Sequence, residues 1–106
     1  RDRARTYRRR RPAQAGEPTR PQVVFLDGAA TDATVIEVRC PSRIGILYRI
    51  TKALAEVGLD IRQATVQTIG AYVVDTFYVR DRAGALIADP FHRAEIERGV
   101  LHAVGS

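Results

Sequence analysis

The chain has 106 residues and a formal net charge of +5, a length that allows one domain with a limited hydrophobic core. It contains no run of about 18 apolar residues, which argues against a membrane-spanning helix, and we recognise no secretory signal pattern. Its single cysteine, Cys40, cannot form an internal disulfide. We therefore expect a small buried thiol and a reducing, cytoplasmic setting.

The positive charge is concentrated on the N-terminal side. Residues 1–22 contain eight arginines and two acidic residues, whereas residues 23–106 carry a net charge of −1. Residues 1–21 have few apolar side chains to bury and end in a proline-containing run, so we predict a disordered linker or the tail of a preceding domain. The folded domain is expected to span residues 22–104. An arginine-rich segment also suits a nucleic-acid-binding arm, which is the less favoured alternative.

Two strands are predicted before the first helix. Residues 22–26 form a short apolar run that ends at an Asp-Gly turn signal, and residues 34–40 alternate between two faces. Pro41 cannot donate a ladder hydrogen bond and is expected to end the second strand. The face of this strand that should meet the helices comprises Thr34, Ile36, Val38 and Cys40.

A tight loop and an amphipathic helix follow. Ser42 is a natural N-cap, and Gly58 is placed to close the helix in a left-handed conformation. Gly45 falls in the first turn, where glycine costs roughly 0.5–1 kcal/mol relative to alanine. We expect it either to allow close approach of a strand or ligand, or to relieve crowding in the loop. The predicted apolar face consists of Leu47, Ile50, Leu54 and Val57, with Thr51.

Residues 59–69 and 72–80 predict a β-hairpin that turns at Gly70-Ala71. The alternation changes phase within the first strand, which indicates a bulge near Arg62-Gln63. The second strand carries bulky residues on both faces, so we expect its second face to be covered by something outside the domain. Asp75, within this strand, is predicted to have a backbone or arginine partner.

A second helix completes the predicted domain. After a turn at residues 81–84, Asp89 caps a helix that has Pro90 at its first position, and Arg93 is expected on the polar side. The predicted buried side consists of Ile96, Val100, Leu101, Ala103 and Val104. This order of elements predicts an α+β fold in which two helices cover one face of a four-stranded antiparallel sheet.

Several segments resemble the signature of ACT domains, which are small regulatory modules. These segments are RIGILYRI at residues 43–50 and ALAEVGLDI at 53–61, supported by ATVIEVR at 33–39 and VVDTFYV at 73–79. The resemblance covers roughly residues 21–104 and extends to the C-terminal ACT domain of bacterial protein-PII uridylyltransferase/uridylyl-removing enzymes. It implies a ferredoxin-like fold, normally β-α-β-β-α-β. The final strand of that order is absent here, so we expect the N-terminal strand at residues 22–26 to fill the vacant position.

The resemblance implies a regulatory function. ACT domains typically bind an amino acid, here expected to be glutamine, against a second ACT domain or a second copy in a homodimer. The PII protein would be reached through the parent enzyme. The ligand-binding residues that the resemblance implies are Ser42, Arg43, Ile44, Gly45 and Ile46 in the loop, and Asp60, Ile61 and Arg62 in the next strand.

One departure from the family pattern bears on this site. Ser42 stands where many ACT domains have an acidic residue that helps to hold the amino group of the ligand. Ser42 carries no charge, so a docking or dimerisation module without a ligand is the alternative interpretation.

The sequence carries no catalytic constellation. His92 and His102 lie ten residues apart without a nearby cysteine or glutamate cluster of metal-binding spacing, so we expect no metal, no cofactor and no enzyme activity in this chain alone. An RNA-binding fold of the RRM kind, with Tyr72 and Tyr78 as stacking residues, is a further alternative. It is disfavoured because the RNP1 pattern is absent.

Overall fold

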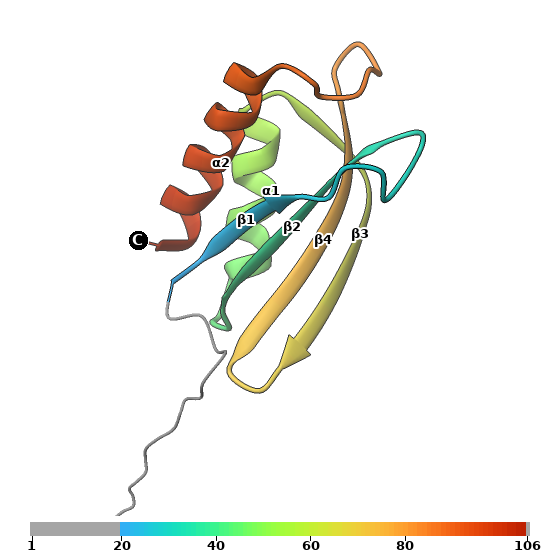
Figure 1. Cartoon of the computed structure of the whole chain (residues 1–106). Coiled ribbons are helices and arrows are strands. Elements are labelled where there is room, and N and C mark those ends of the chain that lie inside the picture. The colour runs from blue at the N-terminus through green and yellow to red at the C-terminus, as the bar shows by residue number, and fades with distance from the viewer. Residues whose placement is uncertain (1–19, 106) are drawn as a thin grey trace, which may run out of the picture.

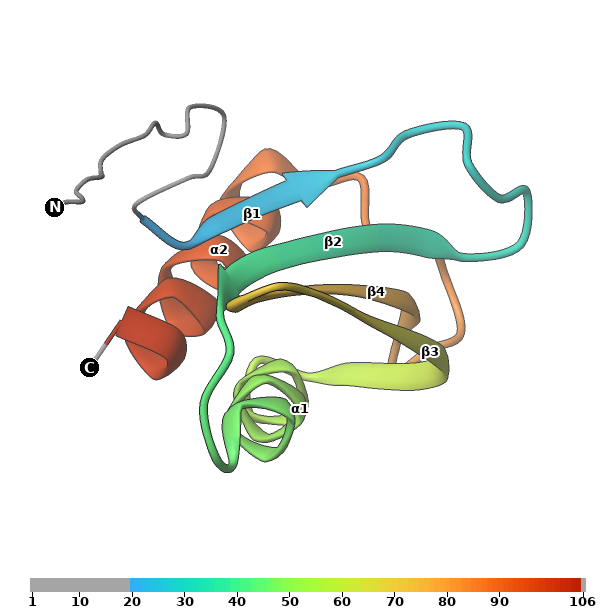
Figure 2. The ribbon, with the colours of Figure 1, turned by 90° about the horizontal axis from the view of Figure 1, so that it is seen from below.

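Four strands and two helices make up residues 20–105, which the computed structural model describes (Figure 1). The elements are β1 (Gln22–Phe25), β2 (Thr34–Pro41), α1 (Ile46–Glu56), β3 (Leu59–Ile69), β4 (Tyr72–Asp81) and α2 (Pro90–Gly105). The strands form one antiparallel sheet in the order β1-β2-β4-β3. Both helices lie on the same face of this sheet (Figure 2), which confirms the predicted α+β ferredoxin-like architecture. Neither described helix combines the length and the apolar composition that a membrane span requires.

β1 occupies the sheet edge that the last strand holds in the β-α-β-β-α-β order. It pairs antiparallel with β2, from Gln22 opposite Arg39 to Phe25 opposite Ile36. The N–H of Leu26 extends this ladder by donating to the carbonyl of Val35 at 2.9 Å. The predicted position of the N-terminal strand in the sheet is therefore confirmed. The prediction for residues 1–19 lies outside the described part of the chain.

The hairpin of β3 and β4 follows the sequence pattern closely. The register shifts between Ile61 and Gln63, which confirms the predicted bulge. The two strands turn after the pair Ile69 and Tyr72, and Gly70 supplies the positive φ of 61° that this turn requires. The open face of β4 is half-buried, whereas nearly all of β3 after Leu59 is exposed or half-exposed.

The core lies between the sheet and the two helices. β2 and β4 contribute alternate residues, and Cys40 is buried among them, as predicted. Leu47, expected on the buried face of α1, is instead 41% exposed. It lies on the side of α1 that points away from the centre of the core. The large apolar side chains that the two helices bury are Ile46, Ile50, Leu54, Ile96, Val100 and Val104.

The start of α1 differs from the prediction. The N-cap position is taken by Gly45, and no side chain caps the helix. Ser42 precedes this position by three residues and instead donates its N–H to the carbonyl of Ala71 at 2.7 Å. Gly45 has a φ of +78°, and a Cβ built there meets nothing within 4 Å. Its left-handed backbone, rather than close packing, therefore accounts for the glycine.

The other helix ends were predicted correctly. Gly58 closes α1 with a φ of +84°. At the start of α2, Asp89 Oδ1 accepts a hydrogen bond from the N–H of Phe91 at 2.9 Å. These signals are local in the sequence, and tertiary packing leaves them intact.

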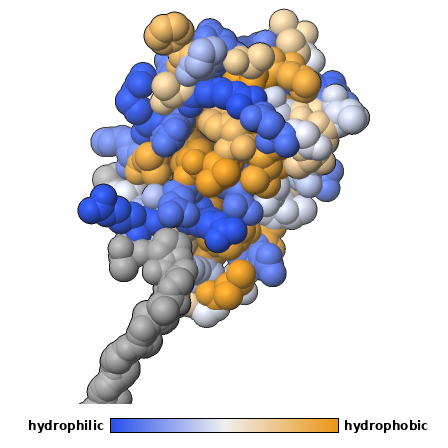
Figure 3. Space-filling model, viewed as in Figure 1, coloured by the Kyte–Doolittle hydropathy of each residue, from blue (hydrophilic) through white to orange (hydrophobic). Residues whose placement is uncertain are grey.

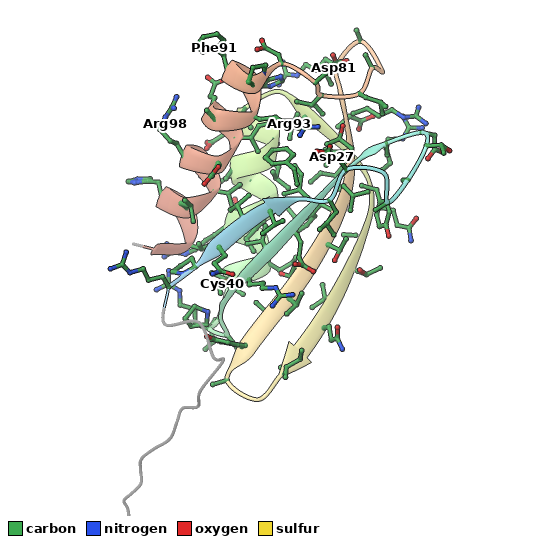
Figure 4. All side chains as sticks on the ribbon, viewed as in Figure 1. Asp27, Cys40, Asp81, Phe91, Arg93 and Arg98 are labelled. Atoms are coloured by element: carbon green, nitrogen blue, oxygen red, sulfur yellow. The ribbon has the colours of Figure 1, made fainter. Side chains whose placement is uncertain are left out.

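Arg93 does not lie on the polar side of α2 as expected. Its guanidinium lies 4.7 Å from the ring centroid of Phe25 and donates to both carboxylate oxygens of Asp27, at 2.7 and 3.1 Å. It also donates to the carbonyl of Ile87 at 2.9 Å. Figure 4 shows Arg93 pointing from α2 toward Asp27 in the loop after β1. The hydrogen bonds from Arg93 hold the pKa of Asp27 below its usual value.

Candidate functional site

Four of the predicted ligand-binding residues, 42–45, lie in the loop between β2 and α1, and a fifth, Ile46, is the first residue of α1. Residues 42–45 are exposed and Ile46 is buried. Arg43 fastens this loop to the end of α2, because its Nη2 donates to the carbonyl of Val104 at 2.9 Å. The N–H of Ile46 donates to the carbonyl of Arg43 at 3.2 Å. The loop is therefore held both by its own turn and by the second helix.

The N-terminus of α1 opens onto this loop. Helix geometry leaves the first N–H groups without an acceptor inside the helix. The first turn of α1 contains no acidic side chain that would compensate the positive end of the helix dipole. This helix end is therefore suited chemically to an anionic group such as a carboxylate.

The other three predicted residues lie at the opposite end of the sheet. Asp60 is paired with Arg80, whereas Pro41, at the start of the loop, is paired with Tyr72. The eight residue steps of β4 from Tyr72 to Arg80 span about 26 Å at roughly 3.3 Å per residue. Asp60 and Arg62 are exposed and form an ion pair of 3.2 Å with each other. Within one copy, the two groups of predicted site residues are thus well separated.

An apolar surface runs along the β3 edge of the domain. α1 packs against β3 and α2 against β1, so the flank of α1 that faces away from α2 lies toward β3. Leu47 on that flank is 41% exposed, the neighbouring Tyr48 is 68% exposed, and Ile44, in the loop just before α1, is fully exposed. Val66 on β3 is 53% exposed and belongs to the face that the helices cover, because its Cα partner is the buried Asp75. We call Ile44, Leu47, Tyr48 and Val66 the edge surface.

The opposite edge has a different character. Val24 on β1 is 39% exposed, and its Cα partner on β2 is Glu37. In Figure 3, hydrophobic residues gather in the middle of the view, where β1 and β2 lie in Figure 1, and hydrophilic residues border them. Val24 therefore provides an exposed strand valine far from the edge surface.

Asp75 is the residue whose environment the sequence analysis missed. Its side chain is 1% exposed, and neither carboxylate oxygen has a hydrogen-bond partner among the described residues. The predicted backbone or arginine partner is therefore wrong. Burial raises the pKa of Asp75 above its ordinary value. The strand alternation could have revealed this burial, because Asp75 lies on the same face of β4 as Val73, Phe77 and Val79, all of which are buried.

Cys40 connects Asp75 electrostatically with the loop. Burial raises the pKa of the Cys40 thiol, and the nearby charge of Asp75 raises it further. The charge of Arg43 acts in the opposite direction and lowers the pKa of Cys40. Cys40 thus lies within electrostatic range of both Asp75 and the loop residue Arg43.

The remaining surface features do not bring reactive groups together. A shallow groove of about 260 Å³ between the helices is lined by side chains that include Arg49, Lys52 and His102. His92 Nε2 lies 3.1 Å from the carbonyl of Val57, and Phe91 and Arg98 point outward from α2 (Figure 4). Within residues 20–105, no three histidine, cysteine or acidic side chains are grouped as metal ligands would be.

Comparison with known proteins agrees with this architecture. The model of the family described as ACT domain matches residues 34–87. The bifunctional uridylyltransferase/uridylyl-removing enzyme of Rhodospirillum rubrum is 41% identical over 93 residues, which cover 83% of this chain and 10% of that protein. The same enzyme of Azospirillum brasilense is 38% identical over 84 residues, 79% of this chain and 9% of that protein. The same enzyme of Streptomyces coelicolor is 39% identical over 84 residues, which cover 79% of this chain and 10% of that protein.

The chain therefore spans about a tenth of the length of the curated relatives that it matches. The matched region of the family model includes β2, α1, β3 and β4, together with the loop at the start of α1. These are the elements that carry the predicted site. The chain belongs to the ACT domain family.

Proposed function

We propose that this chain is a regulatory domain that binds an amino acid, glutamine in the first place, between itself and a second ACT domain. The parent protein would be a cytoplasmic nucleotidyltransferase that modifies the PII protein and responds to nitrogen supply. The similarity to uridylyltransferase/uridylyl-removing enzymes supports this context. The main structural support is the exposed β3 edge, with the edge surface beside it.

Pairing of two β3 edges explains why the predicted site residues are separated within one copy. An unpaired strand edge is a template for another strand, and a two-fold axis makes both copies use the same surface. In an antiparallel pairing centred on Ala64, Asp60 lies opposite the partner's Thr68 and Arg62 opposite the partner's Val66. Residues 60–62 of one copy then approach the end of the partner where its loop of residues 42–46 lies. The arrangement gives two equivalent composite sites.

The chemistry of each composite site suits a zwitterionic ligand. The start of α1 would receive the ligand carboxylate at its free N–H groups. Polar groups of Asp60 and Arg62 from the other copy would contact the ligand side chain. The apolar edge surfaces of the two copies would exclude water around it, which strengthens each polar contact.

Regulation follows if the ligand binds one arrangement of the two domains better than another. A ligand shifts an equilibrium only by its difference in affinity for the two states. A shift from 1:99 to 99:1 requires about 5.5 kcal/mol of such difference. A site shared between two domains provides this selectivity directly, because it is complete only when the two edges are paired.

The test compares two strand valines. Val66→Glu places a charge in the edge surface, whereas Val24→Glu places the same charge on the opposite sheet edge. We expect the purified 106-residue chain and Val24→Glu to form dimers in sedimentation equilibrium and to bind glutamine in calorimetric titration. Val66→Glu should be monomeric and should not bind glutamine.

Each other outcome has a defined meaning. Glutamine binding by a monomeric chain would exclude the composite site. A dimer that is lost in Val66→Glu and binds no glutamine would favour a docking module without a ligand. If Val24→Glu disrupts the dimer and Val66→Glu does not, the interface lies at the β1 edge and the proposed pairing of β3 edges is wrong.

A further inference from the structure

A carboxyl group in the hydrophobic core requires an explanation. Asp75 is as buried as the apolar residues that alternate with it on β4. Neither of its carboxylate oxygens accepts a hydrogen bond from a described residue. Buried polar groups in native proteins are almost always hydrogen-bonded, and a buried carboxylate without a donor is strongly unfavourable. A donor that reached this carboxylate from outside the described residues would relieve that cost.

The position of Asp75 indicates the direction from which this donor arrives. Asp75 has Val38 as its Cα partner on β2 and Val66 as its Cα partner on β3. Val38 is fully buried, whereas Val66 is half-exposed and belongs to the edge surface. The shortest way from Asp75 to the surface along this row crosses Val66. The carboxyl thus lies one strand behind the proposed interface.

Sheet register places the same carboxyl toward the strand end that leads into the proposed ligand loop, because its Cα partner Val38 lies three residues before Pro41. Its charge acts on Cys40, which also responds to Arg43 in the loop. The residues that α1 buries above the sheet, Ile46, Ile50, Ala53 and Leu54, are uncharged, and so is Val66 on β3. Cys40 responds to the charges of both Asp75 and Arg43, whereas the pKa of Asp75 itself is raised by burial.

We propose that Asp75 binds the ammonium group of the amino-acid ligand, which reaches it past Val66. This inference rests on the proposed function. An amino acid carries one group for each feature of this region: a carboxylate for the start of α1, and an ammonium for the buried carboxylate. Asp75 then supplies the negative charge that Ser42 cannot provide. The ligand offers the donors that the described fold lacks, so its binding also relieves the unfavourable burial of Asp75.

This role predicts a pH dependence of binding. Only the ionised carboxylate attracts an ammonium group, and burial raises the pKa of Asp75 in the ligand-free domain. Glutamine affinity should therefore fall as the pH decreases through that raised pKa. Ligand binding should in turn lower the pKa of Asp75, because a nearby positive charge favours the ionised form.

The experiment uses two ligands and two variants of the 106-residue chain. The ligands are glutamine and glutaramate, which is glutamine without its α-amino group. Asp75→Asn removes the charge with little change in shape. Glu37→Gln is the matched control, since Glu37 lies on the adjacent strand opposite Thr76, on the other face of the sheet. Calorimetry measures the affinity of each variant for each ligand.

The wild type and Glu37→Gln should prefer glutamine over glutaramate. Asp75→Asn should lose roughly ten- to a hundredfold in glutamine affinity, as expected for loss of a charged hydrogen bond, and should bind the two ligands about equally. A preserved preference for glutamine in Asp75→Asn would overturn the inference and leave the proposed function standing. A wild type that binds no glutamine would overturn both.

Two further measurements sharpen the test, and the first remains possible if Asp75→Asn folds poorly, because it uses the wild type alone. Carboxyl ¹³C NMR of the wild type should show the pKa of Asp75 falling when glutamine is added, and an unchanged pKa would refute its contact with the ammonium group. Sedimentation without ligand should give the same dimer affinity for Asp75→Asn as for the wild type. A weakened ligand-free dimer would mean that the donor is a side chain of the second copy.

Discussion

Arg93 on α2 donates hydrogen bonds of 2.7 and 3.1 Å to the two carboxylate oxygens of Asp27, which lies 66 residues earlier in the chain. The contact joins the second helix to the loop that follows β1. Since β1 is a four-residue edge strand, a link from its end to α2 holds the strand against the rest of the fold. The same guanidinium stacks on Phe25 within β1.

Replacing Arg93 with alanine should destabilise the domain by about 1–2 kcal/mol, because hydrogen bonds and a cation–π contact are lost. The loss should be local. Amide hydrogen exchange should increase most in β1 and its partner residues on β2. Arg93→Lys keeps the charge but not the paired hydrogen bonds, so its stability should lie between those of the wild type and Arg93→Ala. Uniform acceleration across all strands would contradict the local role.

At acidic pH, two carboxyl groups should make opposing contributions to the pH dependence of the free energy of unfolding. The folded-state pKa of Asp27 is lowered, so its stabilising contribution is present above the unfolded pKa and disappears as the pH falls through the folded value. The folded-state pKa of Asp75 is raised, so the free energy of unfolding should fall as the pH rises from the unfolded value to the folded one.

Asp75→Asn should remove the second effect alone. Between the unfolded-state and folded-state pKa of Asp75, the free energy of unfolding of the variant should exceed that of the wild type by an amount that grows with pH and then levels off. The final difference should be about 1.4 kcal/mol for each unit by which the pKa is raised. Urea unfolding between pH 3 and pH 7 measures this difference. A difference that does not vary with pH would show that Asp75 has an ordinary pKa in the folded domain.

Gly45→Ala should destabilise the domain by about 1–2 kcal/mol, because alanine is unfavourable at the φ of +78° observed there. The effect should be purely conformational, since a Cβ at this position meets nothing within 4 Å. Asparagine tolerates the left-handed region better and should recover part of the loss. Thermal unfolding of the two variants makes the comparison, and equal loss in both would point to a steric cause.

Gly99→Ala should act in the opposite direction. Gly99 lies within α2, where alanine is favoured over glycine by about 1 kcal/mol. The added Cβ would lie 3.4 Å from Cγ1 of Val57, which is about the distance of an ordinary van der Waals contact. We expect stabilisation of about 0.5–1 kcal/mol in chemical unfolding. Destabilisation would show that the two helices cannot accommodate one methyl group.

The sequence was sufficient where structure is determined locally. Asp89 and Pro90 specify the start of α2, and Gly58 specifies the end of α1 through its backbone freedom. The phase change within residues 59–69 specified the bulge. Each of these features depends on neighbours within one or two turns, so single-sequence patterns describe them well.

Prediction failed where distant segments decide the outcome. Ser42 has the chemistry of a cap, but the left-handed turn at Gly45 starts the helix later. The contacts of Arg93 come from residues 66 and 68 positions away, which no helical pattern reveals. The isolation of Asp75, and the distance between Asp60 and the loop, follow from sheet register and are invisible in spacing along the chain.

The placement of β1 also has a mechanical consequence. Within the described fold, β1 is joined to its neighbours by one connection, residues 26–33, and pairs with β2 alone. Tension applied through a segment before Gln22 would peel the β1–β2 ladder one pair at a time, beginning at Gln22 opposite Arg39. The other three strands and both helices would stay connected. Pulling from the N-terminal side would thus expose the edge of β2 before the rest of the domain unfolded. The hydrogen bonds between Arg93 and Asp27, just after β1, would resist further detachment.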